Sequence, residues 1–232
     1  MQVLLFLHRL YFFVILNIRN KKTYKMKKII FLFIISSLIS IKGIGLTLSP
    51  ETEVSILTCA PGNELYSLFG HTAIRINDPR HQIDRVYNYG TFDFSTPHFY
   101  LKYARGLLPY QLTVQKFSHF IYNYQLEERT VYAQTIRLDS LEKQRIFDLL
   151  EENLLPQNRY YLYNFLFDNC TTRSRDILLK SLPDSVAWNM PDVNKNFWNL
   201  LDEYLQASPW VQWGIHTILG QRGNRMESDA RQ

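Results

Sequence analysis

Two short polar motifs hold the residues of this chain that could do chemistry. The first contains Gly70-His71-Thr72, and the second contains Asp168-Asn169-Cys170-Thr171. The residue pattern places His71 on a strand and Cys170 at the start of a helix. The thiolate is the reactive form of cysteine, and an adjacent imidazole is a common base for generating it. The pair therefore predicts the nucleophilic chemistry of a cysteine–histidine hydrolase.

The predicted helix start would activate the thiol. In the predicted helix, five residues recur at the spacing of a single helix face, namely Cys170, Ser174, Ile177, Leu178 and Leu182. The thiol is therefore expected on the side of the helix that faces the core. Free amides in a first helical turn stabilise an anion by roughly 0.3 to 1 kcal/mol, and they can also hold an oxyanion. Asn169 and Thr171 are therefore candidates for a helix-terminus or oxyanion site. Asp168 and Asn169 could equally serve only as helix caps.

A histidine base usually needs a third polar group that fixes its tautomer and orientation. The next predicted strand offers Asn88, Tyr89 and Asp93, and we favour Asn88. The catalytic candidates are thus Cys170, His71 and Asn88. Three further polar residues are candidates for supporting roles, namely Tyr66, Asp93 and Arg173.

A structural interpretation competes with the catalytic one. An exported chain with two cysteines, Cys59 and Cys170, could join them in one disulfide. Such a bond would stabilise the fold by roughly 2 to 4 kcal/mol and would leave no nucleophile. His71 would then be a structural histidine in a non-catalytic periplasmic binding or structural domain.

Composition limits the class of protein. The chain has 232 residues, 46% of them apolar and 15% aromatic, which is enough for one substantial core. Its net charge of +5 arises in residues 1–45, which hold eight basic residues and no acidic one. The remainder has 18 basic against 21 acidic residues and no basic stripe, so we expect no nucleic-acid partner. The six histidines lack metal-ligand spacing, and we expect no metal or other cofactor.

The basic N-terminal region has the anatomy of an export signal. Lys27-Lys28 precede an apolar run from Ile29 to Ile41, and Gly43-Ile44-Gly45 is a small-residue cleavage candidate. We expect residues 26–45 to be a signal peptide and residues 1–25 to be an upstream over-extension of the reading frame. Residues 46–220 are then one exported domain in the periplasm or cell envelope, and residues 221–232 a disordered tail.

The domain should have an α+β fold, with a small antiparallel sheet and packed helices. Strands are predicted at 53–58, 72–76, 85–89 and 130–138, with the second and third paired as a hairpin. A helix should begin after Asp139, with Glu142 completing its cap, and end at Pro156. Residues 99–125 are rich in aromatics and are expected to form short elements. Their aromatic side chains could fill the core or line a groove for an apolar substrate or acyl chain.

Three segments of the chain carry a family resemblance: residues 58–75, 87–94 and 163–173. They resemble the signature segments of the bacterial family called the Lnb N-terminal periplasmic domain, and the likeness extends over roughly residues 50–222. The order of histidine before cysteine is also similar to the circularly permuted NlpC-type papain-like enzymes. This second resemblance implies a papain-like fold with Cys170 as nucleophile, His71 as base and Asn88 as orienting residue. It further implies cleavage of amide or ester bonds in cell-wall peptides or lipids, or transfer of the acyl group.

The resemblance also implies a position at the membrane. Members of the first family continue past a segment like Trp210–Ile215 into a region with membrane spans, whereas residues 220–232 here are polar. We therefore expect this chain to be a truncated or frameshifted copy. We also expect a contact with the membrane and a cell-wall peptide or lipid as the substrate. The sequence leaves the oligomeric state open.

Overall fold

The computed structural model describes residues 45–182 and 195–224. The predicted over-extension and signal peptide lie outside the described residues, except for Gly45, and so do residues 225–232 of the predicted tail. Thr47 begins a compact unit that holds all of the elements below. No helix in the two described ranges combines the length and apolar character needed to cross a membrane.

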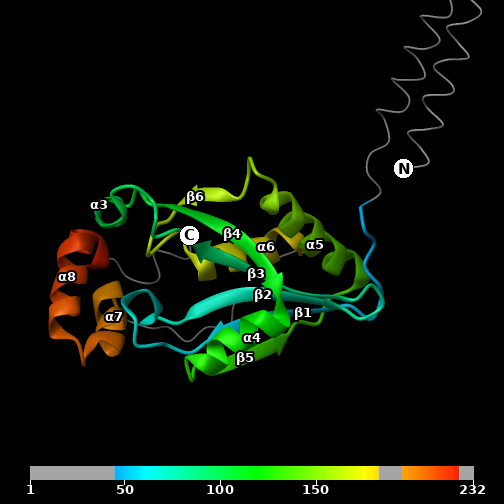
Figure 1. Cartoon of the computed structure of the whole chain (residues 1–232), viewed down its shortest axis with the longest axis horizontal. Helices are drawn as coiled ribbons and strands as arrows, with labels where there is room; N and C mark the ends of the chain where they lie inside the picture. The colour runs from blue at the N-terminus through cyan, green and yellow to red at the C-terminus, as the bar shows by residue number, and fades with distance from the viewer. Residues whose placement is uncertain (1–44, 183–194, 225–232) are drawn as a thin grey trace, which may run out of the picture. The chain divides into compact units, whose positions relative to one another are not determined.

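A six-stranded antiparallel sheet forms the centre of this unit (Figure 1). Its strands lie in the order β5-β1-β2-β3-β4-β6, so β2 and β3 are the middle pair. The bounds are β1 Glu53–Cys59, β2 His71–Asp78, β3 Ile83–Thr91, β4 Pro109–Lys116, β5 Val131–Thr135 and β6 Tyr160–Leu162. The predicted hairpin is confirmed, because Ile74 is paired with Tyr87 and Ile76 with Arg85.

Two strands were not predicted. β4 lies within the aromatic segment, where Gly106 and Pro109 indicate interruption, yet Pro109 is only its first residue. A strand tolerates proline at that position because no preceding ladder bond is lost. Beyond it Tyr110 and Leu112 alternate with less buried residues, as expected for a half-buried strand. β6 has three residues and lies at the edge of the sheet beside β4. It is recognisable as a strand because of this pairing and not from its own sequence.

Helices α5 (Ser140–Leu154) and α6 (Cys170–Ser181) pack against one core cluster of the sheet. This cluster joins buried side chains of β1 to β4 with both helices: Val54, Ile74, Ile76, Tyr87, Tyr89, Leu112, Ile146, Phe147, Leu150 and Ile177. The predicted cap of α5 is confirmed, since Asp139 Oδ1 accepts from the Glu142 amide at 2.8 Å and Glu142 Oε2 accepts from the Asp139 amide at 2.8 Å. The helix ends at Leu154, just before Pro156.

The remaining helices complete two smaller clusters. Helix α4 (Phe117–Leu126) contributes Phe120 to a cluster with Leu57, Cys59, Ala73 and Val86. Helices α7 (Phe197–Leu205) and α8 (Pro209–Leu219) lie together and pack with the loop that precedes α6. Helix α3 (Phe99–Ala104) precedes β4, and the 3₁₀ turn η2 (Gly220–Asn224) follows α8. The start of the predicted disordered tail thus lies in a helical turn.

Candidate active site

The first turn of α6 is fixed by its cap. Asn169 Oδ1 accepts hydrogen bonds from the amides of Thr171 and Thr172, both at 3.0 Å. Thr172 Oγ1 accepts in return from the Asn169 amide at 2.8 Å. The capping role proposed for Asn169 is therefore confirmed, and its side chain is occupied with the helix end. Cys170 follows as the first helical residue, where amide dipoles favour a negative charge.

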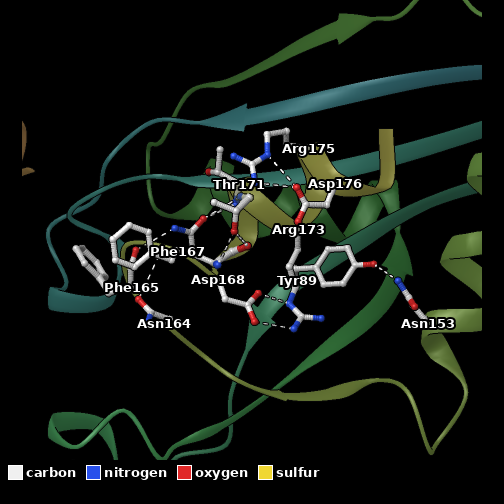
Figure 2. Close-up of polar contacts among 12 residues, drawn as sticks. Tyr89, Asn153, Asn164, Phe165, Phe167, Asp168, Thr171, Arg173, Arg175 and Asp176 are labelled. Carbon is white, nitrogen blue, oxygen red and sulfur yellow. Dashed lines mark hydrogen bonds and ion pairs between the residues drawn. The ribbon is translucent and has the colours of Figure 1, made fainter. Parts of the chain in front are cut away.

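An ion pair closes the loop that leads into α6. Arg173 Nε and Nη2 donate to the two carboxylate oxygens of Asp168 at 2.6 and 2.8 Å (Figure 2). The same guanidinium lies over the Tyr161 ring, 3.6 Å from its centroid. Within the loop, the backbones of Asn164 and Asp168 exchange two hydrogen bonds. Arg173 thus supports the loop before Cys170 through Asp168.

The imidazole comes from the first residue of β2. Gly70 precedes it with φ of +73°, and a Cβ there would lie 2.5 Å from the carbonyl oxygen of Cys59. Only glycine fits this conformation and this approach. His71 Nε2 lies 3.2 Å from Oδ1 of Asn88, a buried residue on β3. Because that oxygen can only accept, the Nε2 atom carries the proton and Nδ1 is left as the basic nitrogen.

The Cys170 thiol is partly buried, and its surroundings favour the thiolate. Burial by itself raises the pKa of Cys170, but a hydrogen bond and charge interaction from His71 reverse this effect. The backbone amide of Thr72 and the Thr171 hydroxyl lower the pKa further, so it lies below the usual thiol value. The structure therefore brings Cys170, His71, Asn88 and Thr171 together.

Gly90 lies beside Cys170 in a left-handed backbone conformation, and sequence reasoning missed it. Its φ is +89°, and a Cβ there would lie 3.6 Å from Cys170 Cβ and 3.8 Å from Tyr163 Cε2. The pairing of β3 with β4 is irregular between Asn88 and Thr91. A glycine inside a strand pattern indicates a bulge or a close approach. That signal was present in Tyr89-Gly90-Thr91 and would have pointed to this position.

Two predicted supporting residues have contacts with residues other than the thiol–imidazole pair. Asp93 is exposed, and its carboxylate accepts from the amide and hydroxyl of Ser95 at 2.8 and 2.7 Å. These hydrogen bonds keep the pKa of Asp93 below its usual value. Tyr66 is exposed, and its ring contacts those of Phe92 and Phe94 at centroid distances of 6.1 and 6.3 Å. Neither residue has a polar contact with His71 in the described part of the chain.

Both cysteines are free, so the alternative disulfide is not formed. Cys59 is paired in register with His71. Its side chain, however, belongs to the core cluster that includes Phe120 of α4, whereas Cys170 packs against the cluster of α5 and α6. Burial raises the pKa of Cys59 to about 11, despite a hydrogen bond from Tyr124. The two thiols therefore have opposite shifts.

The domain contains an apolar cavity of about 450 Å³. Tyr163 forms part of its wall and also lies beside Gly90, next to Cys170. The Tyr163 ring stacks on Tyr110 with centroids 4.2 Å apart. Most of the other lining residues are apolar. They come from α8, from the loop before α6, and from the segment of α3 and β4 that includes Tyr103, Leu108 and Tyr110. Arg105 and Arg222 also line the cavity. Part of the aromatic segment thus lines a cavity as well as filling the core.

A thiol at a helix start, an imidazole and an amide oxygen thus define a thiol–imidazole–amide site on an α+β domain. Among the described residues, no group of three or more His, Cys, Asp or Glu side chains is arranged to hold a metal ion. The chain belongs to the family described as the Lnb N-terminal periplasmic domain, which it matches over residues 47–202. The domain is accordingly exported and periplasmic, as the sequence predicted. No curated protein and no solved structure shows significant similarity to it.

Alkylation should distinguish the two thiols. At about pH 8, iodoacetamide should label Cys170 rapidly, because its pKa lies below the usual value. Cys59 should stay unlabelled until the protein is denatured, because a pKa of about 11 leaves on the order of one thiol in a thousand ionised. Mass spectrometry of the labelled peptides measures both, with Cys170→Ala as the control. Equal labelling of the native thiols would contradict the two environments.

A comparison of alanine substitutions at two glycines with positive φ tests whether Gly90 positions the thiol. Gly90→Ala and Gly106→Ala should each lower the free energy of unfolding by roughly 1 to 2 kcal/mol, because alanine disfavours left-handed backbone. Gly106 has no atom within 4 Å of its hypothetical Cβ, so it controls for the backbone effect. Only Gly90→Ala should also change the alkylation rate of Cys170. The same rate in both variants would show that Gly90 does not position the thiol.

Proposed function

We propose that this domain is an exported thiol-dependent hydrolase or acyltransferase that acts on amide or ester bonds of cell-envelope peptides or lipids. Cys170 is the nucleophile, His71 the base and Asn88 the residue that orients the base. One observation carries this proposal: His71 is hydrogen-bonded to Asn88 and also lowers the pKa of the Cys170 thiol. The strand with the histidine precedes the helix with the cysteine, so the arrangement fits a permuted NlpC-type, papain-like enzyme.

The reaction begins with transfer of the thiol proton to Nδ1 of His71. The thiolate attacks the substrate carbonyl carbon, a carbon–sulfur bond forms, and the carbonyl electrons move onto oxygen. When this tetrahedral species collapses, the bond to the leaving nitrogen or oxygen breaks and the imidazolium protonates the leaving group. Water or another nucleophile then gives its proton to His71 and attacks the carbonyl carbon of the thioester. When this second tetrahedral species collapses, the carbon–sulfur bond breaks, the acyl product is released and the sulfur leaves as the thiolate.

Amides near the sulfur can stabilise the charges that form. The Thr72 amide donates toward the sulfur, and Cys170 lies in the first turn of α6, where amides lack helical partners. Preorganised donors of this kind stabilise an oxyanion without reorganisation during the reaction. The side chain of Asn169 already accepts two amides of α6, so it supports this site by holding the helix end.

The hydrogen bonding of Asn88 favours a functional role for this residue. Among the described residues its Nδ2 is buried without a hydrogen-bond partner, while its Oδ1 faces His71. A buried unpaired amide group costs roughly 1 to 3 kcal/mol, so an apolar residue of similar size would suit the core better. Orientation of His71 explains why a polar residue lies there.

The apolar cavity favours substrates with an apolar group. A volume of about 450 Å³ with largely apolar walls accepts an acyl chain or a bulky apolar side chain. Tyr163 lines the cavity, and both Tyr163 and Cys170 lie beside Gly90, which supports placing the apolar group in the cavity with the scissile carbonyl toward the sulfur. The two arginines among the lining residues could interact with an anionic part of the same substrate.

Activated acyl esters test the catalytic assignment without knowledge of the natural substrate. A p-nitrophenyl ester should acylate Cys170, detected as an added acyl mass, and Cys170→Ala should abolish this. His71→Ala should slow acylation by about 100-fold or more, which is the lower range for a general base. Asn88→Ala should cause a smaller loss with the same sign.

Cys59→Ala serves as the control and should acylate normally, because Cys59 lies in another core cluster. Circular dichroism would show that each variant is folded. Acylation of Cys170→Ala at the wild-type rate would remove Cys170 as the nucleophile.

Filling the cavity tests the substrate preference. Gly214 lines it and has open space around a hypothetical Cβ, so Gly214→Leu should reduce its volume without a clash. The acylation rate with an octanoyl ester, relative to an acetyl ester, should fall about tenfold. Thr217→Leu is the matched control, because this exposed residue of α8 does not line the cavity. An unchanged ratio in Gly214→Leu would show that the cavity does not receive the acyl group.

A further inference from the structure

Two threonine hydroxyls meet directly beside the thiol–imidazole pair. Thr72 follows His71 on β2, and Thr171 follows Cys170 on α6. Their Oγ1 atoms lie 2.9 Å apart, which is a hydrogen bond between residues 99 positions apart in the chain. The two elements that carry the proposed base and nucleophile are therefore linked through the residues that follow them.

The same threonines also contact the sulfur. Thr171 Oγ1 lies 4.0 Å from Cys170 Sγ, within reach of a weak hydrogen bond to sulfur. Thr72 donates its backbone amide toward the sulfur, so its side chain holds Thr171 while its main chain faces Cys170. A hydroxyl pair in this position restricts both the sulfur and the first turn of α6.

The stability of α6 does not require this pair. Asn169 and Thr172 already form a complete capping box at the helix start. Further along the helix, Ser174 is buried, and Ile177 packs in the core cluster with the sheet and α5. The threonine pair is exposed, and a hydrogen bond in contact with water adds little to folding. The position of the threonine pair is better explained by its contact with the Cys170 sulfur.

We propose that Thr72 and Thr171 form a hydroxyl clamp that sets the position of Cys170 Sγ relative to the His71 ring. In this clamp Thr72 orients the Thr171 hydroxyl, and Thr171 donates to the sulfur anion. Both are positioning residues, and the catalytic consequence of the clamp rests on the proposed function. The clamp should matter most when the sulfur is charged, because a hydrogen bond to a charged group is the stronger kind.

The test uses a Cys59→Ala background, so that Cys170 is the only thiol. Thr72→Val and Thr171→Val remove one hydroxyl each and keep the β-branched shape. Each should move the pH profile of iodoacetamide alkylation upward and slow alkylation at pH 7 by about tenfold. Thr171→Ser retains a hydroxyl and should restore the profile that Thr171→Val loses. Circular dichroism confirms folding, and Thr171→Ala is the second variant if valine disturbs the helix end.

A second hydroxyl pair in the same sheet provides the matched control. Ser55 Oγ and Thr135 Oγ1 lie 3.1 Å apart and link β1 to β5. Thr135→Val removes an equivalent hydrogen bond away from Cys170 and should leave the alkylation profile unchanged.

The alkylation profile and the acyl-enzyme assay separate the clamp from the proposed function. If the valine variants keep the wild-type profile while His71→Ala shifts it, the clamp proposal is wrong, and an acyl-enzyme on Cys170 would still support the proposed function. If the valine variants shift the profile but no ester acylates Cys170, the clamp stands and the catalytic proposal fails.

Discussion

The contact between the first turn of α6 and the central strands β2 and β3 is the constraint on which the site depends. This contact brings residues 170–171 beside residues 71–72 and 88–90. Gly90 lies at this contact with a left-handed backbone, which is strained for any residue with a side chain. The contact needs a helix that begins at Cys170, and the Asn169 cap and the Asp168–Arg173 ion pair enforce that start. The polar residues around the cysteine thus mainly determine where the helix starts.

The two cysteines show how strongly surroundings control one chemical group. Cys59 lies in an apolar cluster, and burial dominates, so its pKa rises to about 11. Cys170 is also desolvated, yet an imidazole, a backbone amide and a hydroxyl near the sulfur lower its pKa. Donors directed at a sulfur favour its anion, whereas an apolar cluster supplies none. The number of cysteines alone suggests a disulfide. That bond is not formed, because the two side chains pack in different core clusters.

Local sequence patterns predicted much of the fold. Alternation predicted β1, β2, β3 and β5, and polar residues at both ends of the first turn predicted the cap of α5. β4 and β6 were missed because Pro109 indicated interruption and because three residues carry no period. For the site, the sequence nominated Cys170, His71 and Asn88, which lie together, and also Tyr66 and Asp93, whose contacts are with Phe92 and Ser95. Sequence periodicity indicates which face of a helix or strand is buried, but it does not indicate which other elements pack against that face.

The sequence by itself determined the residues with reactive groups, the family and the periplasmic compartment, because these are properties of residue types and their order along the chain. Only the tertiary structure decided that Asn88 faces His71, that Thr72 meets Thr171, and that Tyr163, beside Gly90, lines an apolar cavity. These relations join residues far apart in the chain. They depend on strand register and helix docking, which follow from packing of the whole domain.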